Sequence, residues 1–149
     1  MAATSVQFSV AIHMMAALAE HYGEAVRSDQ LAASVKADSS FIRRSLSKLA
    51  KAGLVETTRG RNGACSLARP PEEITLLDIY RASGAPPPFS IHHYDVQEKC
   101  SVSVHIKFCL GDVLDKVRLS FEETLSKTTL ADIISDLRKR SCKDRSGPL

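Results

Sequence analysis

The chain has 149 residues, 44% of them hydrophobic, with seven glycines and six prolines, a composition that argues against extensive disorder. This length suits one compact domain, or one domain with a helical extension. The sequence contains no run of about eighteen apolar residues that would span a membrane. It also lacks the basic segment that opens a signal peptide, so we expect a cytoplasmic protein.

The net charge of +3 is unevenly distributed along the chain. The window from Lys36 to Arg69 holds eight basic and two acidic residues, a net charge of +6, whereas the rest of the chain carries −3. A basic footprint on a nearly neutral protein indicates a polyanionic partner at one surface. For any single lysine, a solvated face without a partner is the alternative.

Apolar residues recur at helical spacing from Thr4 to Tyr22, which predicts a first helix that Thr4 or Ser5 caps and Gly23 ends. Because aromatic residues are few and tryptophan is absent, we expect a mostly aliphatic core.

A helix-turn-helix pattern follows. The segment SDQLAASV predicts a short helix with Ser28 as its N-cap, and a third helix begins after Asp38 or Ser39 and ends before Gly53. The apolar positions of the third helix leave small polar and basic residues on its outer side, namely Ser40, Arg43, Arg44, Ser47, Lys48 and Lys51. Two short helices, the second presenting such residues early, are typical of DNA-binding proteins.

A β-hairpin is predicted directly after the third helix. Its strands cover residues 54–58 and 65–68, and Asn62-Gly63 favours the turn because both residues tolerate positive φ. Arg59 and Arg61 lie at the tip, where they suit a wing that reaches a neighbouring groove or phosphates. A basic hairpin alone is a weak signal, but its position after a helix-turn-helix strengthens it.

The rest of the chain predicts three more helices. Thr75 caps a helix over LLDIYRAS that ends at Gly84, and Thr128 or Thr129 caps a final helix through Leu137, beyond which we expect fraying. Between them, Val102–Leu125 predicts a long helix with an apolar stripe that the chain offers little else to cover, so a second copy is its expected cover.

The predicted fold class is therefore mainly α with a small β-hairpin wing: a winged helix-turn-helix domain plus a long dimerisation helix. The expected organisation is a DNA-binding domain over 1–84, a proline-rich linker over 85–100, the dimerisation and C-terminal helices over 101–140, and a flexible tail over 141–149.

These features together resemble the Rrf2 family of bacterial winged-helix transcription regulators, the family of IscR, NsrR and CymR. The resemblance rests on LAASVKADSSFIRRSLSKLAKAGLV, on RGRNGACSLARPPEEITLLDI, on Cys100 and on the closing TLADI, and it covers nearly the whole chain. The wing departs slightly from the family pattern, since Gly63-Ala64-Cys65 stands where two glycines and an aromatic residue are usual.

The resemblance implies a homodimer on a palindromic double-stranded DNA operator, with the helix-turn-helix in the major groove and the wing in the minor groove. Early arginines of a recognition helix can bond guanine edges or phosphates, and the hydroxyls and helix N-terminus suit phosphate contacts. The candidate DNA-binding residues are Ser28, Ser39, Ser40, Arg43, Arg44, Lys48, Arg59, Arg61 and Asn62.

Many members of this family hold an iron–sulfur cluster on three cysteines spaced about six residues apart. Here Cys100 matches the first position, but Ile106 and Asp112 stand at the next two, so we expect a cluster-free member without a resident cofactor. An iron–sulfur or metal-sensing site built from Cys100, Cys109 and a histidine (His92, His93 or His105) is kept as an alternative.

Thiol sensing is the favoured alternative to a cluster. Cys100 stands near the start of the long helix, where the helix dipole favours a thiolate. Cys65 in the wing and Cys109 on the apolar stripe are the other redox-sensing candidates.

The sequence therefore predicts a homodimeric DNA-binding regulator, a repressor, that responds to redox or electrophile signals through cysteine thiols. A winged-helix protein-interaction module that regulates a partner enzyme is a further alternative. The chain itself is not expected to be an enzyme, because it shows no catalytic triad, phosphate loop or paired carboxylates.

Overall fold

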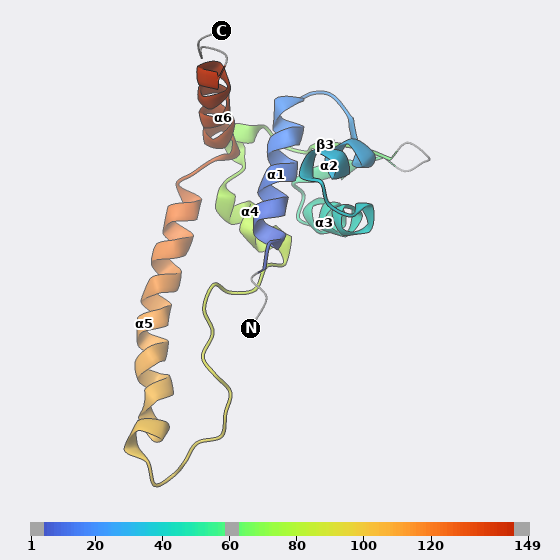
Figure 1. The fold of residues 1–149 in the computed structure, drawn as a ribbon. Coiled ribbons are helices and arrows are strands. Elements are labelled where there is room, and N and C mark those ends of the chain that lie inside the picture. The colour runs from blue at the N-terminus through green and yellow to red at the C-terminus, as the bar shows by residue number, and fades with distance from the viewer. Residues whose placement is uncertain (1–4, 59–62, 145–149) are drawn as a thin grey trace. The chain divides into compact units, whose positions relative to one another are not determined.

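A computed structural model of the chain describes residues 5–58 and 63–144 (Figure 1). The predicted wing-tip residues Arg59, Arg61 and Asn62 therefore lie outside the described residues. The chain forms two compact units, one of residues up to 85 together with those from 125 onward, and one of residues 86–124. Across the described ranges, no helix has both the length and the hydropathy to cross a bilayer.

The first unit is helical with one small sheet, which confirms the predicted fold class. Its helices are α1 (Gln7–Glu20), α2 (Ser28–Val35), α3 (Ser39–Lys51), the 3-10 helix η1 (Pro71–Glu73), α4 (Leu76–Ser83) and α6 (Leu130–Asp144). The antiparallel sheet has the order β1-β3-β2 and comprises β1 (Val26–Arg27), β2 (Val55–Thr57) and β3 (Ala64–Leu67).

Local capping explains where the helices of the first unit begin and end. The carboxylate of Asp38 accepts hydrogen bonds from the backbone N–H groups of Ser40 and Phe41, at 3.0 and 3.2 Å, and so caps α3. Thr75 and Asp78 form the reciprocal capping box of α4. Gly53 ends α3 with a φ of +74°, a conformation that favours glycine.

Two predicted caps are corrected. Arg27, not Ser28, is the N-cap of α2, and its backbone N–H donates to Gln30 Oε1 at 3.0 Å. The first helix begins at Gln7 instead of near Thr4, which lies outside the described residues. The hydroxyl of Ser5 does accept a bond from the Gln7 N–H, at 3.4 Å.

The sheet has one strand more than the predicted hairpin. Val26 and Arg27 of β1 pair with Cys65 and Ala64 of β3. A two-residue strand is too short to show an alternating pattern, and its partner lies far along the chain, so the sequence carried no signal for it. Cys65 and Leu67 share the buried face of β3.

The core of the first unit surrounds α1. Met14, Met15 and Leu18 of α1 are buried against Ile42 and Leu49 of α3, and the same cluster includes side chains of α4 and α6. Apolar packing therefore holds one side of α3, the candidate recognition helix, and leaves its opposite side exposed to solvent.

The last helix packs within this first unit, whereas the predicted organisation placed it with the long helix. Leu130 donates its backbone N–H to Ile74 O at 2.8 Å and its side chain is fully buried. The helix also continues to Asp144 instead of fraying after Leu137. Ion pairs of Arg138 with Glu20 and of Arg140 with Asp136 accompany this extension.

Replacing Leu130 by alanine is expected to lower the free energy of unfolding by about 2–5 kcal/mol, because a buried leucine is lost and a cavity remains. Leu137→Ala, at a side chain 42% exposed on the same helix, should cost less than about 1 kcal/mol. Urea denaturation of both variants measures the difference. Equal, small losses would show that α6 is not part of this core.

The second unit consists of a linker and the long helix α5 (Ser101–Ser126), which continues into the first unit. The linker runs along α5, since Lys107 Nζ donates to Tyr94 O at 2.7 Å and the Gln97 N–H donates to Ser103 Oγ at 2.8 Å. The bounds of α5 confirm the predicted long helix, and none of its described residues is buried within the single chain.

Candidate nucleic-acid interface

The outer side of α3 presents an uninterrupted polar and basic surface. Ile42, Leu46 and Leu49 fix one side of the helix in the core. The exposed residues are Ser39, Ser40, Arg43, Arg44, Ser47, Lys48 and Lys51. The helix contains no acidic residue, so its exposed side has a single sign of charge.

The cations of α3 are available to an outside partner. Among the residues that the structure describes, Arg43, Arg44 and Lys51 form no ion pair; Arg43 contacts Ser39 Oγ at 3.5 Å. By contrast, Arg27 pairs with Asp29 at 3.2 Å. Charges without a counter-ion on a rigid helix favour a polyanionic partner.

Lys48 differs from the other cations of this helix. Its Nζ lies 3.0 Å from the position that a Cβ on Gly84 would occupy, so its side chain extends toward the end of α4. A cation there interacts favourably with the helix C-terminus. The structure thus gives Lys48 a local role besides the DNA contact predicted from the sequence.

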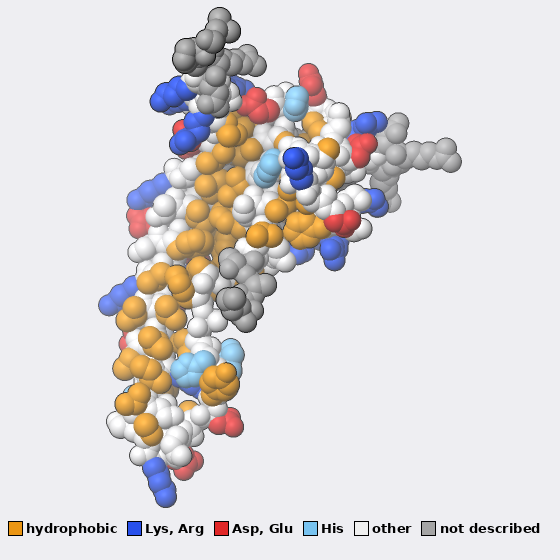
Figure 2. Space-filling view, viewed as in Figure 1, with side chains coloured by type: hydrophobic (Ala, Val, Ile, Leu, Met, Phe, Trp, Pro, Cys, Tyr) orange, Lys and Arg blue, Asp and Glu red, His pale blue; other side chains and the backbone are white. Residues whose placement is uncertain are grey.

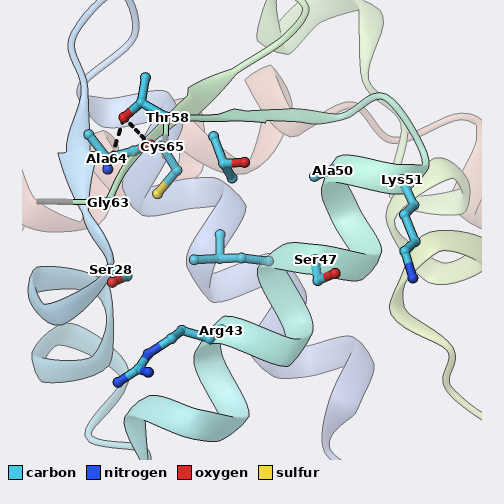
Figure 3. A pocket seen from close by; sticks show the side chains of 11 residues that line it. Ser28, Arg43, Ser47, Ala50, Lys51, Thr58, Gly63, Ala64 and Cys65 are labelled. Atoms are coloured by element: carbon cyan, nitrogen blue, oxygen red, sulfur yellow. Dashed lines mark hydrogen bonds between the residues drawn. The ribbon is translucent and has the colours of Figure 1, made fainter. Parts of the chain in front are cut away.

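A groove of about 490 Å³ lies between α3, the start of α2 and the hairpin (Figure 3). It brings together two predicted DNA-binding residues, Ser28 and Arg43, whereas Ser39, Ser40 and Arg44 do not line it. Its walls also include residues absent from the candidate set, namely Ser47, Lys51, Thr57 and Thr58. Ser47 and Lys51 were predictable from their outward position on α3. The two threonines carry no signal without the sheet geometry.

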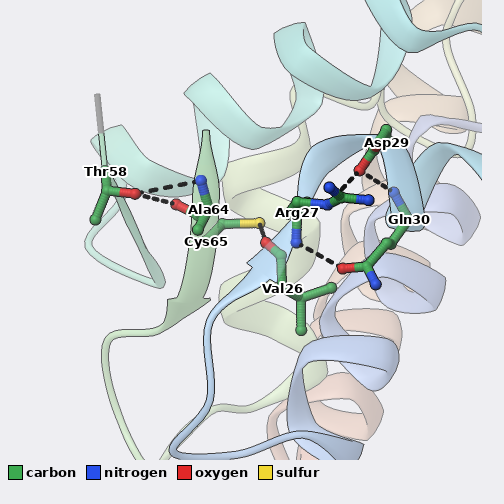
Figure 4. A network of polar contacts seen from close by, with 7 residues as sticks. All are labelled: Val26, Arg27, Asp29, Gln30, Thr58, Ala64 and Cys65. Atoms are coloured by element: carbon green, nitrogen blue, oxygen red, sulfur yellow. Dashed lines mark hydrogen bonds and ion pairs between the residues drawn. The ribbon is translucent and has the colours of Figure 1, made fainter. Parts of the chain in front are cut away.

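Cys65 lies at the base of this groove and is held in place. Its side chain is 2% exposed, and its Sγ donates to Val26 O at 3.1 Å, which ties β3 to β1 (Figure 4). On the other side of the strand, the Thr58 hydroxyl donates to Ala64 O and accepts from Ala64 N–H, both at 3.2 Å. Burial raises the pKa of the Cys65 thiol from 9.0 to about 11. These properties describe an inert structural thiol and argue against its predicted sensing role.

Alkylation with iodoacetamide at pH 8 is expected to modify Cys65 far more slowly than the other three cysteines. A pKa of about 11 instead of 9.0 leaves about a hundredfold less thiolate at this pH, and burial slows access further. Peptide mass spectrometry over time measures the order. Modification of Cys65 at a rate equal to that of exposed Cys142 would contradict the described environment.

Cys100 and Cys109 are exposed free thiols of the second unit. Cys100 immediately precedes α5, and the backbone N–H of Ser103 donates to its Sγ at 3.5 Å. Cys109 lies in the helix itself. A rise of about 1.5 Å per residue along α5 separates the two positions by roughly 13 Å.

A family model described as an iron-dependent transcriptional regulator, Rrf2, matches residues 4–136 of the chain. The chain belongs to the Rrf2 family. The resemblance stated from the sequence is confirmed, as is the prediction of a transcriptional regulator and not an enzyme.

Similar proteins agree with this membership. YwnA of Bacillus subtilis strain 168, named as an HTH-type transcriptional regulator, is 30% identical over 131 residues, which cover 88% of this chain and 96% of YwnA. The structure of T. potens IscR superimposes with a TM-score of 0.67 at 28% identity, covering 91% of this chain and 88% of that one. CymR, the global cysteine regulator of B. subtilis, gives a TM-score of 0.63 at 26% identity over 91% and 98% of the two chains.

The residues of this Rrf2 member do not fit the iron that the family description implies. Within the described ranges, no group of three histidine, cysteine or acidic side chains comes together. Cys100, directly before α5, and Cys109, within it, lie roughly 13 Å apart along the helix, too far to ligate one iron–sulfur cluster together. The alternative site of Cys100, Cys109 and a histidine is therefore opposed by the geometry of the donors.

Proposed function

We propose that this Rrf2 protein is a homodimeric repressor that binds a palindromic operator and responds to oxidants or electrophiles through an exposed thiol. The observation that carries the DNA part is the acid-free outer side of α3, with Arg43, Arg44 and Lys51 lacking counter-ions in the described structure. Rigid packing of Ile42 and Leu49 positions these groups for a polyanion.

The proposed DNA contacts divide into two sets. Arg43 and Arg44 stand early in α3, where they can reach base edges in the major groove, while Ser28, Ser39 and Ser40 lie near helix N-termini that suit phosphates. Arg59, Arg61 and Asn62 stay predicted wing contacts outside the described residues. Lys48 is proposed as a contact only for a conformation in which its side chain leaves the end of α4.

The uncovered apolar side of α5 supports the homodimer. Val102, Val113 and Val117 lie within one side of the helix and are 67%, 55% and 38% exposed, respectively. Figure 2 shows hydrophobic side chains of the second unit at the surface. A second copy of the same helix would bury this stripe, and the two-fold symmetry of such a pair would require a palindromic site.

The proposed sensor is Cys100, with Cys109 as the second choice. Cys100 is exposed, and the backbone N–H of Ser103 donates to its sulfur at 3.5 Å. Its position next to the proposed dimer helix gives a modification a route to operator affinity. The similarity to CymR, which acts in B. subtilis as a cysteine regulator, is consistent with a thiol-linked signal.

The DNA part is tested by selecting duplexes from a random library with the pure protein and measuring their affinity by fluorescence anisotropy. We expect the selected duplexes to contain an inverted repeat. The logarithm of their affinity should fall linearly with the logarithm of the salt concentration. Selection that returns no enriched sequence, together with affinity that salt leaves unchanged, would refute it.

The sensor part has its own expected result. Peroxide should oxidise the Cys100 thiolate to a sulfenic acid, with reduction of the peroxide to water, and change operator affinity by at least about fivefold, the low end of allosteric couplings. Cys100→Ser should bind the operator normally but no longer respond, while Cys142→Ser serves as the matched exposed-cysteine control. A full response in Cys100→Ser would exclude Cys100 as the sensor.

A further inference from the structure

The groove between α3 and the hairpin is lined by apolar residues and by two cations. Leu46, Ala50 and Ala64 line it together with Cys65, and the two cations that line it are Arg43, in the first half of α3, and Lys51, its last residue (Figure 3). Its volume of about 490 Å³ falls within the range of small-molecule sites, roughly 300–1,000 Å³. A surface that contacts only phosphate groups does not need an apolar lining.

Small residues are among those that line the groove. Ala50 of α3 and Gly63 and Ala64 of the hairpin all contribute to its lining, so a longer side chain at Ala50 would occupy part of the space. The hairpin wall is fixed by the two bonds between Thr58 and Ala64 and by the bond from Cys65 to Val26. The groove is therefore a formed feature bounded by hydrogen-bonded strands and a packed helix.

We propose that this groove binds a small amphipathic carboxylate, with its carboxylate at Arg43 and its hydrocarbon chain over Leu46, Ala50 and Ala64. The guanidinium of Arg43 suits a carboxylate because it can donate two parallel hydrogen bonds. Ser28 lies at the same end of the groove and offers a hydroxyl (Figure 3). The carboxylate end and the apolar end of the ligand thus meet matching surfaces.

The site gives such a ligand a regulatory consequence. Arg43 belongs to the proposed DNA contacts, so a carboxylate bound there and a DNA duplex exclude each other. This consequence rests on the proposed function, whereas binding of the carboxylate itself does not.

Sodium octanoate is the probe, titrated into the full chain and followed by backbone amide NMR. We expect saturable shifts at the amides of Ala50 and Ala64, with neither acetate, which lacks the chain, nor 1-octanol, which lacks the charge, reproducing them. Ala50→Leu should abolish the saturable shifts by filling the groove. Ala33→Leu, at an exposed alanine of α2 outside the groove, is the matched control and should retain them.

Arg43→Ala provides a second test that does not depend on how Ala50→Leu folds. It should weaken octanoate binding about twofold to fivefold, the size of a solvent-exposed charge pair. Unchanged affinity in Arg43→Ala, octanoate shifts that persist in a folded Ala50→Leu, or acetate shifts equal to those of octanoate would each overturn the proposal.

A duplex added at low salt separates this proposal from the proposed function. DNA should displace octanoate, and simultaneous binding of both would refute the mutual exclusion. A protein that binds octanoate but no DNA would refute the proposed function and leave the carboxylate site standing. Binding of DNA without octanoate would refute the carboxylate site alone.

Discussion

Arg43→Ala and Arg44→Ala should each weaken binding to the selected operator by about 5- to 150-fold. An arginine that bonds a base edge in the major groove contributes about 1–3 kcal/mol of discrimination, which corresponds to this range. If either arginine contacts phosphate instead, its removal should weaken all duplexes alike and reduce the slope of log affinity against log salt by about one. Anisotropy titrations on the operator and on a scrambled duplex, at several salt concentrations, distinguish the two contacts.

Arg140→Ala is the matched control for both variants. Arg140 is an exposed arginine of α6 that pairs with Asp136 at 2.9 Å, away from α3 in sequence and on a different helix. Its loss removes the same formal charge, so it corrects for any general effect of net charge on affinity. Equal losses in Arg140→Ala, Arg43→Ala and Arg44→Ala would mean that DNA binding is diffuse and that α3 is not the recognition helix.

Much of the winged unit was predictable because its signals are local. Asp38, Thr75, Gly53 and Gly84 mark helix ends by chemistry that acts over three or four residues, and the structure uses all four in the expected way. The apolar periodicity of α3 likewise determined which side chains face solvent.

The features that the sequence missed depend on partners far along the chain. Strand β1 exists because Val26 meets Cys65, and α6 joins the first unit because Leu130 bonds to Ile74. Lys48 appeared to be one more cation of the outer side until its neighbour at Gly84 was known. Periodicity and caps carry no information about such pairings. The sequence therefore indicates which helix or strand a candidate residue belongs to better than it indicates which distant residue that side chain contacts.

The largest effect on assembly is expected from Val113→Asp, which places a carboxylate in the uncovered apolar side of α5. Val113 is 55% exposed in the single chain, so the substitution should leave the fold of each chain intact. In the proposed dimer the carboxylate would be buried without a partner, at a cost of about 3–5 kcal/mol. That cost corresponds to roughly a hundredfold to several-thousandfold weaker association. Analytical ultracentrifugation should show a monomer at concentrations where the unaltered protein is a dimer.

Leu119→Asp separates the position of the charge from its mere presence on the helix. Leu119 is 60% exposed on α5, but six residues of helix rotate it about 120° away from Val113. This variant should remain dimeric and keep its operator affinity. Val113→Asp should lose palindromic binding, because one recognition helix contacts only half of the site and retains the weaker, salt-sensitive affinity for any duplex. If the Val113→Asp protein stays dimeric, the dimer contact does not lie on this side of α5. If it is a monomer with full operator affinity, operator binding does not require two copies.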